Sequence, residues 1–133
     1  MTGSRHTLPR CKRLQHDLEY QRVYGARVRK TSGPLAGFAA PNGRAFWRLG
    51  LSIGRQVGGA VERHRIKRAV REAFRLGQHD FPQLDSGGEP RGLDLIVSAR
   101  AHDPLEATDY CRHVRELAAA LHREWVKRDA RHV

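Results

Sequence analysis

The side chains of this sequence that are best suited to chemistry are cations clustered in the middle of the chain. Five of them recur at spacings of three and four residues and would share one face of a helix, namely His64, Lys67, Arg68, Arg71 and Arg75. Arg63 and Arg65 flank that face. Clustered arginine and lysine attract phosphate groups, so the predicted chemistry is the binding of a polyanion. The alternative is a solvated helix surface, but such surfaces usually mix both charge signs, and here the interrupting acids are Glu62 and Glu72.

An amphipathic helix has to position these cations. Its apolar residues lie at i, i+3, i+4, i+7 and i+8, and they are Ile66, Ala69, Val70, Ala73 and Phe74. This spacing predicts a helix that begins at Ala60 and is ended by Gly77 as a C′ residue. Before the helix, the apolar residues of Leu49–Ile53 predict a strand, and glycines at 54, 58 and 59 predict a loop.

Composition restricts the class of protein. The chain has 133 residues, with 25 lysines and arginines against 14 acids, which gives a net charge of +11. Such a charge implies a polyanionic partner, usually nucleic acid. The excess of arginine over lysine adds little, because a GC-rich genome would also produce it. The length suits one RNA-binding domain over residues 1–133, with flexible tails at 1–7 and 129–133.

The cellular location follows from what the sequence lacks. Cys11 and Cys111 are too few for a disulfide framework. Residues 1–10 have no apolar core typical of a signal peptide, and no apolar run has the length of a membrane span. We therefore expect a cytoplasmic protein with no membrane association, and nothing in the sequence implies a protein partner.

Catalytic and metal-binding patterns are also missing from the sequence. No acidic residue is placed to orient His64, and Asp94 and Asp103 do not have the spacing or context of a two-metal site. The glycines at 54, 58 and 59 are not followed by the Gly-Lys-Ser/Thr of a phosphate loop, and no cysteine and histidine set has zinc spacing. The sequence thus predicts no catalytic residue and no metal or cofactor bound by this chain.

The N-terminal part predicts a short helix over residues 16–24, with Gly25 placed to stop it. Tyr20 and Tyr24 are i, i+4 neighbours on this helix. They could pack in the core with Val23, or they could present their rings to a groove in which nucleic-acid bases stack. Next, Leu35–Ala40 predicts a strand, and Pro41-Asn42-Gly43 predicts a hairpin turn into Phe46–Ile53.

The C-terminal half predicts a loop over residues 85–92, a short inner strand over 93–97 and a long helix that ends near Arg128. Asp103-Pro104 and Thr108 are alternative starts of that helix. The element order is helix, two or more strands, helix, strand, helix. We therefore predict an α/β (α+β-like) fold with a single small mixed sheet and three helices.

The central stretch Arg48–Arg75, RLGLSIGRQVGGAVERHRIKRAVREAFR, resembles the protein subunit of bacterial ribonuclease P. That family has a strand of the type R-x-G-L-S-V, a glycine-containing loop and then A-V-x-R-N-R-I-K-R-x-x-R-E. The early LPR…RL…Y…VY segment and the late LDLIVSAR segment extend the resemblance over about residues 8–126. The family asparagines correspond here to Gly59 and His64.

The resemblance implies a ribonuclease P protein-like fold with a left-handed β-α-β crossover, which is unusual because such connections are nearly always right-handed. It also implies a protein subunit that binds a catalytic RNA and the 5′ leader of precursor tRNA. Bond cleavage would occur on the RNA, with magnesium in the RNA-containing holoenzyme. Histidine is a poor substitute for a carbonyl ligand near hydrated magnesium, so His64 makes a metal contact by the protein doubtful.

Site residues follow from the matched motif positions. Arg63, Arg65, Lys67, Arg68 and Arg71 take the RNA-binding role, and the predicted set also includes Arg55, His64 and Arg75. Tyr20, Tyr24 and Phe38 match aromatic positions that line the family's leader cleft, which favours exposed tyrosine rings over core packing. Arg22 and Arg27 are close enough in sequence to meet leader phosphates.

Two other function classes have to be distinguished from this one. A ribosomal or RNA-chaperone protein would carry similar charge but would not support leader cleavage. A DNA-binding regulator would need a second helix close before Ala60, where the sequence predicts a strand and a glycine loop.

Overall fold

A computed structural model describes residues 8–131 of the chain. The helices are α1 (Asp17–Gly25), α2 (Ala60–Gly77) and α3 (Ala107–Arg131), and the strands are β1 (Arg29–Ser32), β2 (Leu35–Pro41), β3 (Arg48–Ser52), β4 (Leu84–Ser86), β5 (Glu89–Arg91) and β6 (Leu93–Ala99). Short 3-10 turns lie at η2 (Arg10–Lys12), η3 (Arg55–Val57) and η4 (Gln78–Asp80). No helix within this range is long and apolar enough to cross a membrane.

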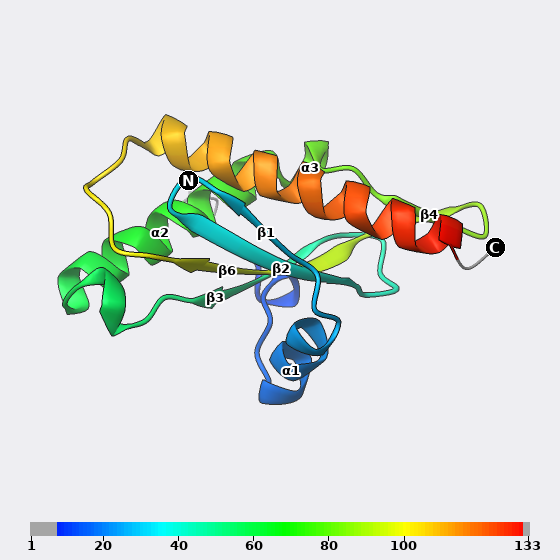
Figure 1. The fold of residues 1–133 in the computed structure, drawn as a ribbon, viewed down its shortest axis with the longest axis horizontal. Helices are drawn as coiled ribbons and strands as arrows, with labels where there is room; N and C mark the ends of the chain where they lie inside the picture. The colour runs from blue at the N-terminus through cyan, green and yellow to red at the C-terminus, as the bar shows by residue number, and fades with distance from the viewer. Residues whose placement is uncertain (1–7, 132–133) are drawn as a thin grey trace.

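The main sheet has four strands in the order β1-β2-β6-β3. β2 runs antiparallel to both of its neighbours, β1 and β6, whereas β3 runs parallel to β6. α2 and α3 cover one face of this sheet, and α1 packs on the other (Figure 1). The predicted class, three helices with a small mixed sheet, is therefore confirmed. β3, α2 and β6 form the parallel crossover, and its left-handed sense stays a prediction.

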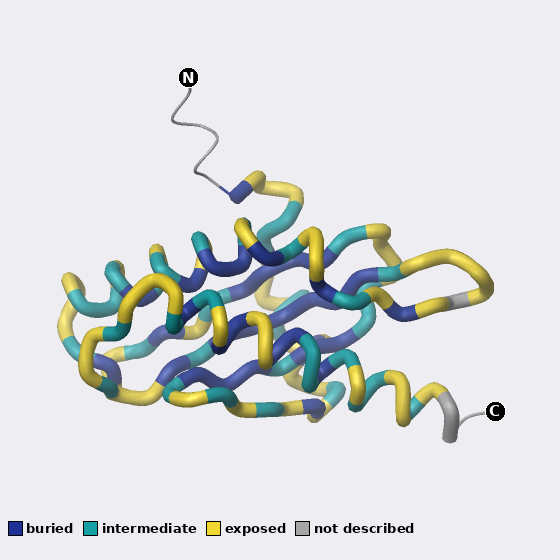
Figure 2. Tube along the Cα trace, turned by 90° about the horizontal axis from the view of Figure 1, so that it is seen from above, coloured by how far each residue is buried: buried dark blue, intermediate teal, exposed yellow. Residues whose placement is uncertain are grey.

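The core follows from the alternation of side chains along β6, the strand at the centre of the fold. Leu93, Leu95 and Val97 point into the cluster shared with α2 and α3, and Ile96 points into a smaller cluster with Val23 of α1. All five side chains are fully buried, and each such side chain contributes roughly 1.5–3 kcal/mol through its burial. Figure 2 shows the same arrangement, with buried strands between helices whose outer turns are exposed.

The helix faces predicted from periodicity are confirmed. On α2, Ile66, Val70, Ala73 and Phe74 are buried, and on α3 the buried residues include Tyr110, Val114, Leu117, Ala118 and Leu121. Trp125 is partly buried against both clusters, and its indole N–H donates to the carbonyl of Ala39 at 2.9 Å. Polar and charged residues of α2 therefore face solvent because its apolar stripe is held against the sheet and α3.

The predicted hairpin between residues 35–40 and 46–53 is wrong. β6 lies between β2 and β3 and pairs with both, so the turn at Pro41-Asn42-Gly43 connects strands that are not neighbours. The apolar β6 takes this inner position because both of its faces can be buried there. The actual hairpin joins β1 to β2 through Gly33, at φ 57°, and the polar β1 (RKTS) has no apolar alternation from which it could have been recognised.

The segment predicted as a loop over 85–92 contains a second small sheet. β4 and β5 pair antiparallel around Gly87 and Gly88, whose φ angles of 66° and 87° suit a tight two-residue turn. The sequence DSGGEPRG has few apolar residues, so periodicity did not reveal these three-residue strands.

Helix boundaries differ from the prediction in detail. α2 spans Ala60–Gly77, but Gly77 has φ −98° and is not a left-handed cap. A Cβ at this glycine would lie 3.1 Å from the ring of Phe81, so close packing accounts for it. α3 begins at Ala107, next to the Thr108 alternative, and includes residues 129–131, which were predicted as part of a tail. The predicted tail at 1–7 lies outside the described residues.

Candidate nucleic-acid interface

The cations of α2 fall into two groups, of which one forms ion pairs with acids of the same helix. His64, Arg68 and Arg71 are exposed and Lys67 is half-buried. The hydrogen bonds and ion pairs between arginines and acids of α2 involve two other residues. Arg65 and Arg75 differ, because they bind the acids three residues earlier on the same helix.

The two paired arginines are partly neutralised. Arg65 contacts Glu62 at 2.5 Å, and Arg75 binds both carboxylate oxygens of Glu72 at 3.0 and 2.5 Å. The hydrogen bonds to Glu72 raise the pKa of Arg75 above its ordinary value. The potential for phosphate binding is therefore concentrated on the other group, Lys67, Arg68 and Arg71.

Two predicted residues occupy different surroundings. Arg55 lies outside α2, in the exposed 3-10 turn η3 that precedes the helix. Arg63 is half-buried, and its Nε atom has no hydrogen-bond partner in the described part of the chain. The structure thus does not place all eight predicted residues on one surface.

α1 packs on the opposite face of the sheet from α2 (Figure 1). Of the three aromatic residues predicted for the leader cleft, Tyr24 and Phe38 lie together there and Tyr20 does not. Tyr24 and Phe38 pack edge to face, with ring centroids 4.9 Å apart, and the guanidinium of Arg29 lies 6.0 Å from the Phe38 centroid. Tyr24 is 36% exposed, so it is not a core residue, whereas its neighbour Val23 is fully buried. Tyr24, Phe38 and Arg29 therefore form an aromatic and cationic platform at the surface.

Tyr20 faces another part of the molecule. Its hydroxyl accepts the backbone N–H of Leu51 at 3.1 Å, and its ring packs over Gly50 of β3. A Cβ at Gly50 would lie 3.0 Å from that ring and 2.8 Å from Leu14, so only glycine allows this approach. The prediction that places Tyr20 beside Tyr24 and Phe38 is not supported by this geometry.

A hollow of about 220 Å³ lies on the sheet face beyond the platform. Its polar and cationic lining includes Arg29, Thr31, Gln56, Ser98 and Arg100. Arg29 belongs both to this hollow and to the platform. Thr31 and Ala36, which also line the hollow, pair in the sheet two residues from the Arg29–Phe38 pair, so the hollow adjoins the platform. Sequence reasoning missed these residues because they lie on β1, on β6 and just after it, and on η3, which meet only in the folded chain.

A buried polar network holds α1 on the sheet. Asp94 of β6 is fully buried and receives two hydrogen bonds from Arg48, at 2.8 and 2.7 Å, and one from Asn42 at 2.9 Å. Arg22 of α1 also pairs with Asp94, and Arg48 reaches Glu19 of α1 at 2.9 Å. Arg22 is thus engaged within the protein, contrary to the expectation that it meets the leader.

Glu19 connects this network to the start of α1. Its carboxylate accepts the backbone N–H groups of Gln15 at 2.9 Å and His16 at 3.3 Å. These hydrogen bonds, foremost that of Gln15, together with Arg48, lower the pKa of Glu19 to about 2. A lone acid inside the apolar run LDLIV was a sequence signal of this network, because a buried carboxylate needs partners.

One serine, histidine and acid cluster does not form a catalytic triad. Ser32 Oγ lies 2.8 Å from His113 Nδ1 and donates to Glu116 at 2.5 Å. In a triad the acid binds the histidine nitrogen that is remote from the serine. Here the acid binds the serine itself, so the cluster joins α3 to the β1–β2 hairpin.

The described residues also do not fit a resident metal ion. No group of three or more histidine, cysteine, aspartate or glutamate side chains within 8–131 could hold one. The magnesium implied by the sequence resemblance therefore has no ligand set on this part of the chain, and no chemical step is assigned to a protein-bound metal.

Comparison with known proteins agrees with this architecture. The family model for Ribonuclease P matches residues 8–124. The ribonuclease P protein component of Methylococcus capsulatus is 40% identical over 84 residues, which make up 62% of this chain and 66% of that relative. The chain thus matches just under two thirds of the relative's length.

Solved structures show the same fold. The Staphylococcus aureus RNase P protein matches with a TM-score of 0.58 and 25% identity, over 80% of this chain and 91% of that one. The Thermotoga maritima RNase P protein matches with a TM-score of 0.63 over 81% and 96%, and at 22% identity this likeness concerns the fold alone. Because the family model covers most of the chain, this protein belongs to the ribonuclease P protein family, whose enzyme is an endoribonuclease of tRNA processing. The family predicted from the central motif is confirmed.

Proposed function

We propose that this chain is the protein subunit of a ribonuclease P holoenzyme and that it supports removal of the 5′ leader from precursor tRNA. Family membership supports the enzyme. The observation that carries the leader-binding role is the exposed platform of Tyr24, Phe38 and Arg29. Single-stranded nucleic acid is held by stacking bases on aromatic rings beside cationic groups, which is the combination found on this platform.

The leader path on this surface runs from the platform toward the adjoining hollow. A base stacks on the exposed ring of Tyr24, which Phe38 supports from the side. Arg29 and Arg100 then supply positive charge for the phosphates of the following nucleotides. Because stacking and charge contacts are tolerant of base identity, leaders of varied sequence can bind.

Three cations of α2 bind the catalytic RNA in this proposal. Lys67, Arg68 and Arg71 lie on the α2 side of the sheet and the leader platform on the α1 side, so both RNAs can be held at once (Figure 1). The protein then contributes by orientation, while the RNA cleaves the bond with its own magnesium.

Reconstitution tests the proposal. The catalytic RNA from the same source is mixed with precursor tRNA at low magnesium, with and without the protein, and the 5′ product is measured. We expect the protein to lower the concentration of precursor tRNA and of magnesium that cleavage requires. A basic protein of similar charge and unrelated fold is the control, and equal stimulation by that control would refute the proposal.

The alternative class is a ribosomal or RNA-chaperone protein. Such a protein would bind structured RNA through charge and would not distinguish precursor from mature tRNA. The exposed Tyr24–Phe38 pair favours leader binding, because charge alone does not require aromatic rings at the surface.

A further inference from the structure

We propose that a groove between the N-terminal lead-in, residues 8–16, and α2 binds consecutive phosphates of the catalytic RNA backbone, with Arg13 as its central residue. This inference rests on the proposed function for the identity of the RNA. Arg10 and Arg13 of the lead-in add a second cationic wall to the α2 face.

Two adjoining hollows make up the groove. The larger, of about 420 Å³, is lined by Arg10, Arg13, Leu14, Gln15 and Arg71. The smaller, of about 140 Å³, shares Arg13, Leu14 and Arg71, and its other lining residues are Tyr20, Leu49, Leu51 and Lys67. Because three lining residues are common to both, the hollows form one groove.

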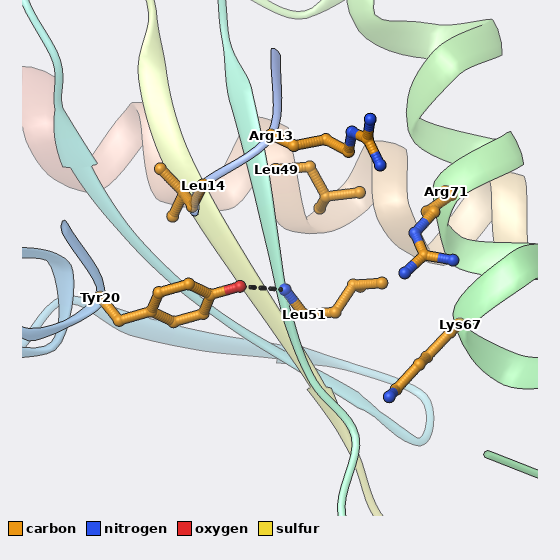
Figure 3. Close-up of a pocket in the computed structure, with 7 residues that line it drawn as sticks. All are labelled: Arg13, Leu14, Tyr20, Leu49, Leu51, Lys67 and Arg71. Atoms are coloured by element: carbon orange, nitrogen blue, oxygen red, sulfur yellow. Dashed lines mark hydrogen bonds between the residues drawn. The ribbon is translucent and has the colours of Figure 1, made fainter. Parts of the chain in front are cut away.

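Three cations converge on the smaller hollow from two elements. Figure 3 shows Arg13 reaching in from the lead-in, and Lys67 and Arg71 reaching in from α2. Among the described residues, no acidic side chain lines either hollow. Like charges gathered in a partly enclosed space repel each other, and a bound anion removes that cost.

Arg13 carries a hydrogen-bond donor that is not satisfied within the described chain. Its Nε atom is shielded from solvent and has no hydrogen-bond partner in the described chain. A buried donor without a partner costs free energy, and a phosphate oxygen is the acceptor that an arginine binds most favourably. Backbone contacts hold the lead-in against β3. The backbone N–H of Leu14 donates to the carbonyl of Leu49 at 2.8 Å, and Arg13 forms an isolated parallel β-bridge with Leu49.

Tyr20 forms the inner wall of the groove. Its hydroxyl holds the backbone N–H of Leu51 on the free edge of β3 (Figure 3). The platform residues Tyr24, Phe38 and Arg29 come from α1, β2 and β1, and none of them lines the groove. Tyr20 thus belongs to the groove and is not part of the leader platform.

The catalytic RNA is the assigned occupant because the groove continues the α2 face. Lys67 and Arg71 belong to both, and the groove is open to solvent beside Arg10. The repeated cations on two walls suit a strand whose phosphates recur along its length.

The first experiment uses the protein alone and inorganic pyrophosphate as the probe. Thermal unfolding is followed during titration with pyrophosphate and, in parallel, with sodium chloride at equal ionic strength. The variants are Arg13→Gln and Lys67→Gln, with Arg115→Gln on α3 as a control that removes one exposed charge elsewhere. We expect pyrophosphate to raise the melting temperature of the wild type and the control, and to bind both groove variants at least about fivefold more weakly.

Equal pyrophosphate affinity in all four proteins overturns the groove. Lys67 is a surface residue of α2, so Lys67→Gln decides the matter even if Arg13→Gln is poorly folded. Because this experiment involves no RNA cleavage, its outcome is separate from that of the proposed function.

The second experiment identifies the occupant. Binding of the catalytic RNA and of precursor and mature tRNA is measured as a function of salt. We expect Arg13→Gln to lower the log–log salt slope for the catalytic RNA by about 0.7–0.9, the value for one lost phosphate contact. Discrimination between precursor and mature tRNA should stay unchanged. If the variant loses that discrimination and keeps its affinity for the catalytic RNA, the groove belongs to the leader and the assignment is wrong.

Discussion

Tyr20 and Tyr24 are one turn apart on α1 but serve different surfaces of the molecule. Tyr24 is 36% exposed and packs on Phe38, whereas Tyr20 holds the edge of β3 through its hydroxyl. Two rings spaced by four residues share a helix face, but α1 lies across several strands, so each ring meets a different strand. The role of each aromatic residue can therefore be tested separately.

Replacement of Tyr24 by alanine tests the leader platform. We expect Tyr24→Ala to weaken precursor tRNA binding by about 1–3 kcal/mol, the scale of one lost stacking contact, and to leave mature tRNA binding nearly unchanged. Tyr24→Phe keeps the ring and should bind like the wild type. Equal weakening for both tRNAs, together with a large drop in melting temperature, would show that Tyr24 is structural.

Two arginines of α2, Arg68 and Arg65, allow a matched test of RNA binding, because only Arg65 forms an ion pair with Glu62 three residues earlier. Arg68 is exposed, whereas Arg65 is half-buried and binds Glu62. We expect Arg68→Ala to reduce the log–log salt slope of catalytic RNA binding by about 0.7–0.9, and Arg65→Ala to change it less. An unchanged slope for a folded Arg68→Ala variant would remove Arg68 from the interface.

At the scale of elements, the placement of α1 depends on a few polar contacts. α1 is short, and Val23 is its one buried residue. Glu19 and Arg22 connect it to Arg48 and Asp94 of the sheet. Removing one partner from such a buried group leaves an uncompensated charge, so the network determines where α1 and Tyr24 lie.

Acid should loosen this attachment through Glu19. The folded-state pKa of about 2 lies below the ordinary value of 4.5, so Glu19 stabilises the fold fully above about pH 4.5. That contribution is lost as the pH falls toward 2. Because the side chain of Glu19 is 24% exposed, solvent screening reduces it to on the order of 1–2 kcal/mol.

Urea unfolding of the wild type and Glu19→Gln between pH 7 and pH 2 measures this effect. We expect the wild type to be more stable at pH 7 and the difference to narrow as the pH approaches 2. Comparing the two proteins cancels the pH dependence of other acids, such as Glu116 and Glu124, whose pKa values are also lowered. A pH-independent difference would show that Glu19 acts by packing and not by charge.

At the scale of the whole molecule, the α1 side of the sheet carries the aromatic platform and the α2 side carries the cations of that helix (Figure 1). The groove at the edge of β3 lies where these two sides meet. A thin sheet with different chemistry on its two sides can hold two RNA segments close together. This arrangement suits a protein that orients RNAs and leaves the reaction to one of them.

The absence of a protein active site can be tested on the assembled enzyme. We expect His64→Ala, His113→Asn and Glu116→Gln to keep single-turnover cleavage rates within about tenfold of the wild type at saturating protein and high magnesium. Loss of a general acid or base would cost roughly 10²–10⁴-fold. A variant that folds and assembles normally but loses cleavage by that factor would assign the chemistry to the protein.

Local spacing in the sequence was enough to predict α2, with its buried stripe and its cations. Periodicity is a property of neighbouring residues, and the apolar stripe of Ile66, Val70 and Phe74 has to be buried wherever the helix packs. The inner position of the apolar strand β6 followed for the same reason. The family motif was readable as well, because it lies in one continuous stretch.

The tertiary structure alone decided which strands pair, which charges cancel and which surfaces meet. β6 lies between β2 and β3 because hydrogen bonds between strands join residues that are far apart in sequence. Arg48 and Asp94 are 46 residues apart, so no local pattern links them. Arg13 and Arg71 face one groove for the same reason: the lead-in runs along the free edge of β3, beside α2, only after the chain has folded.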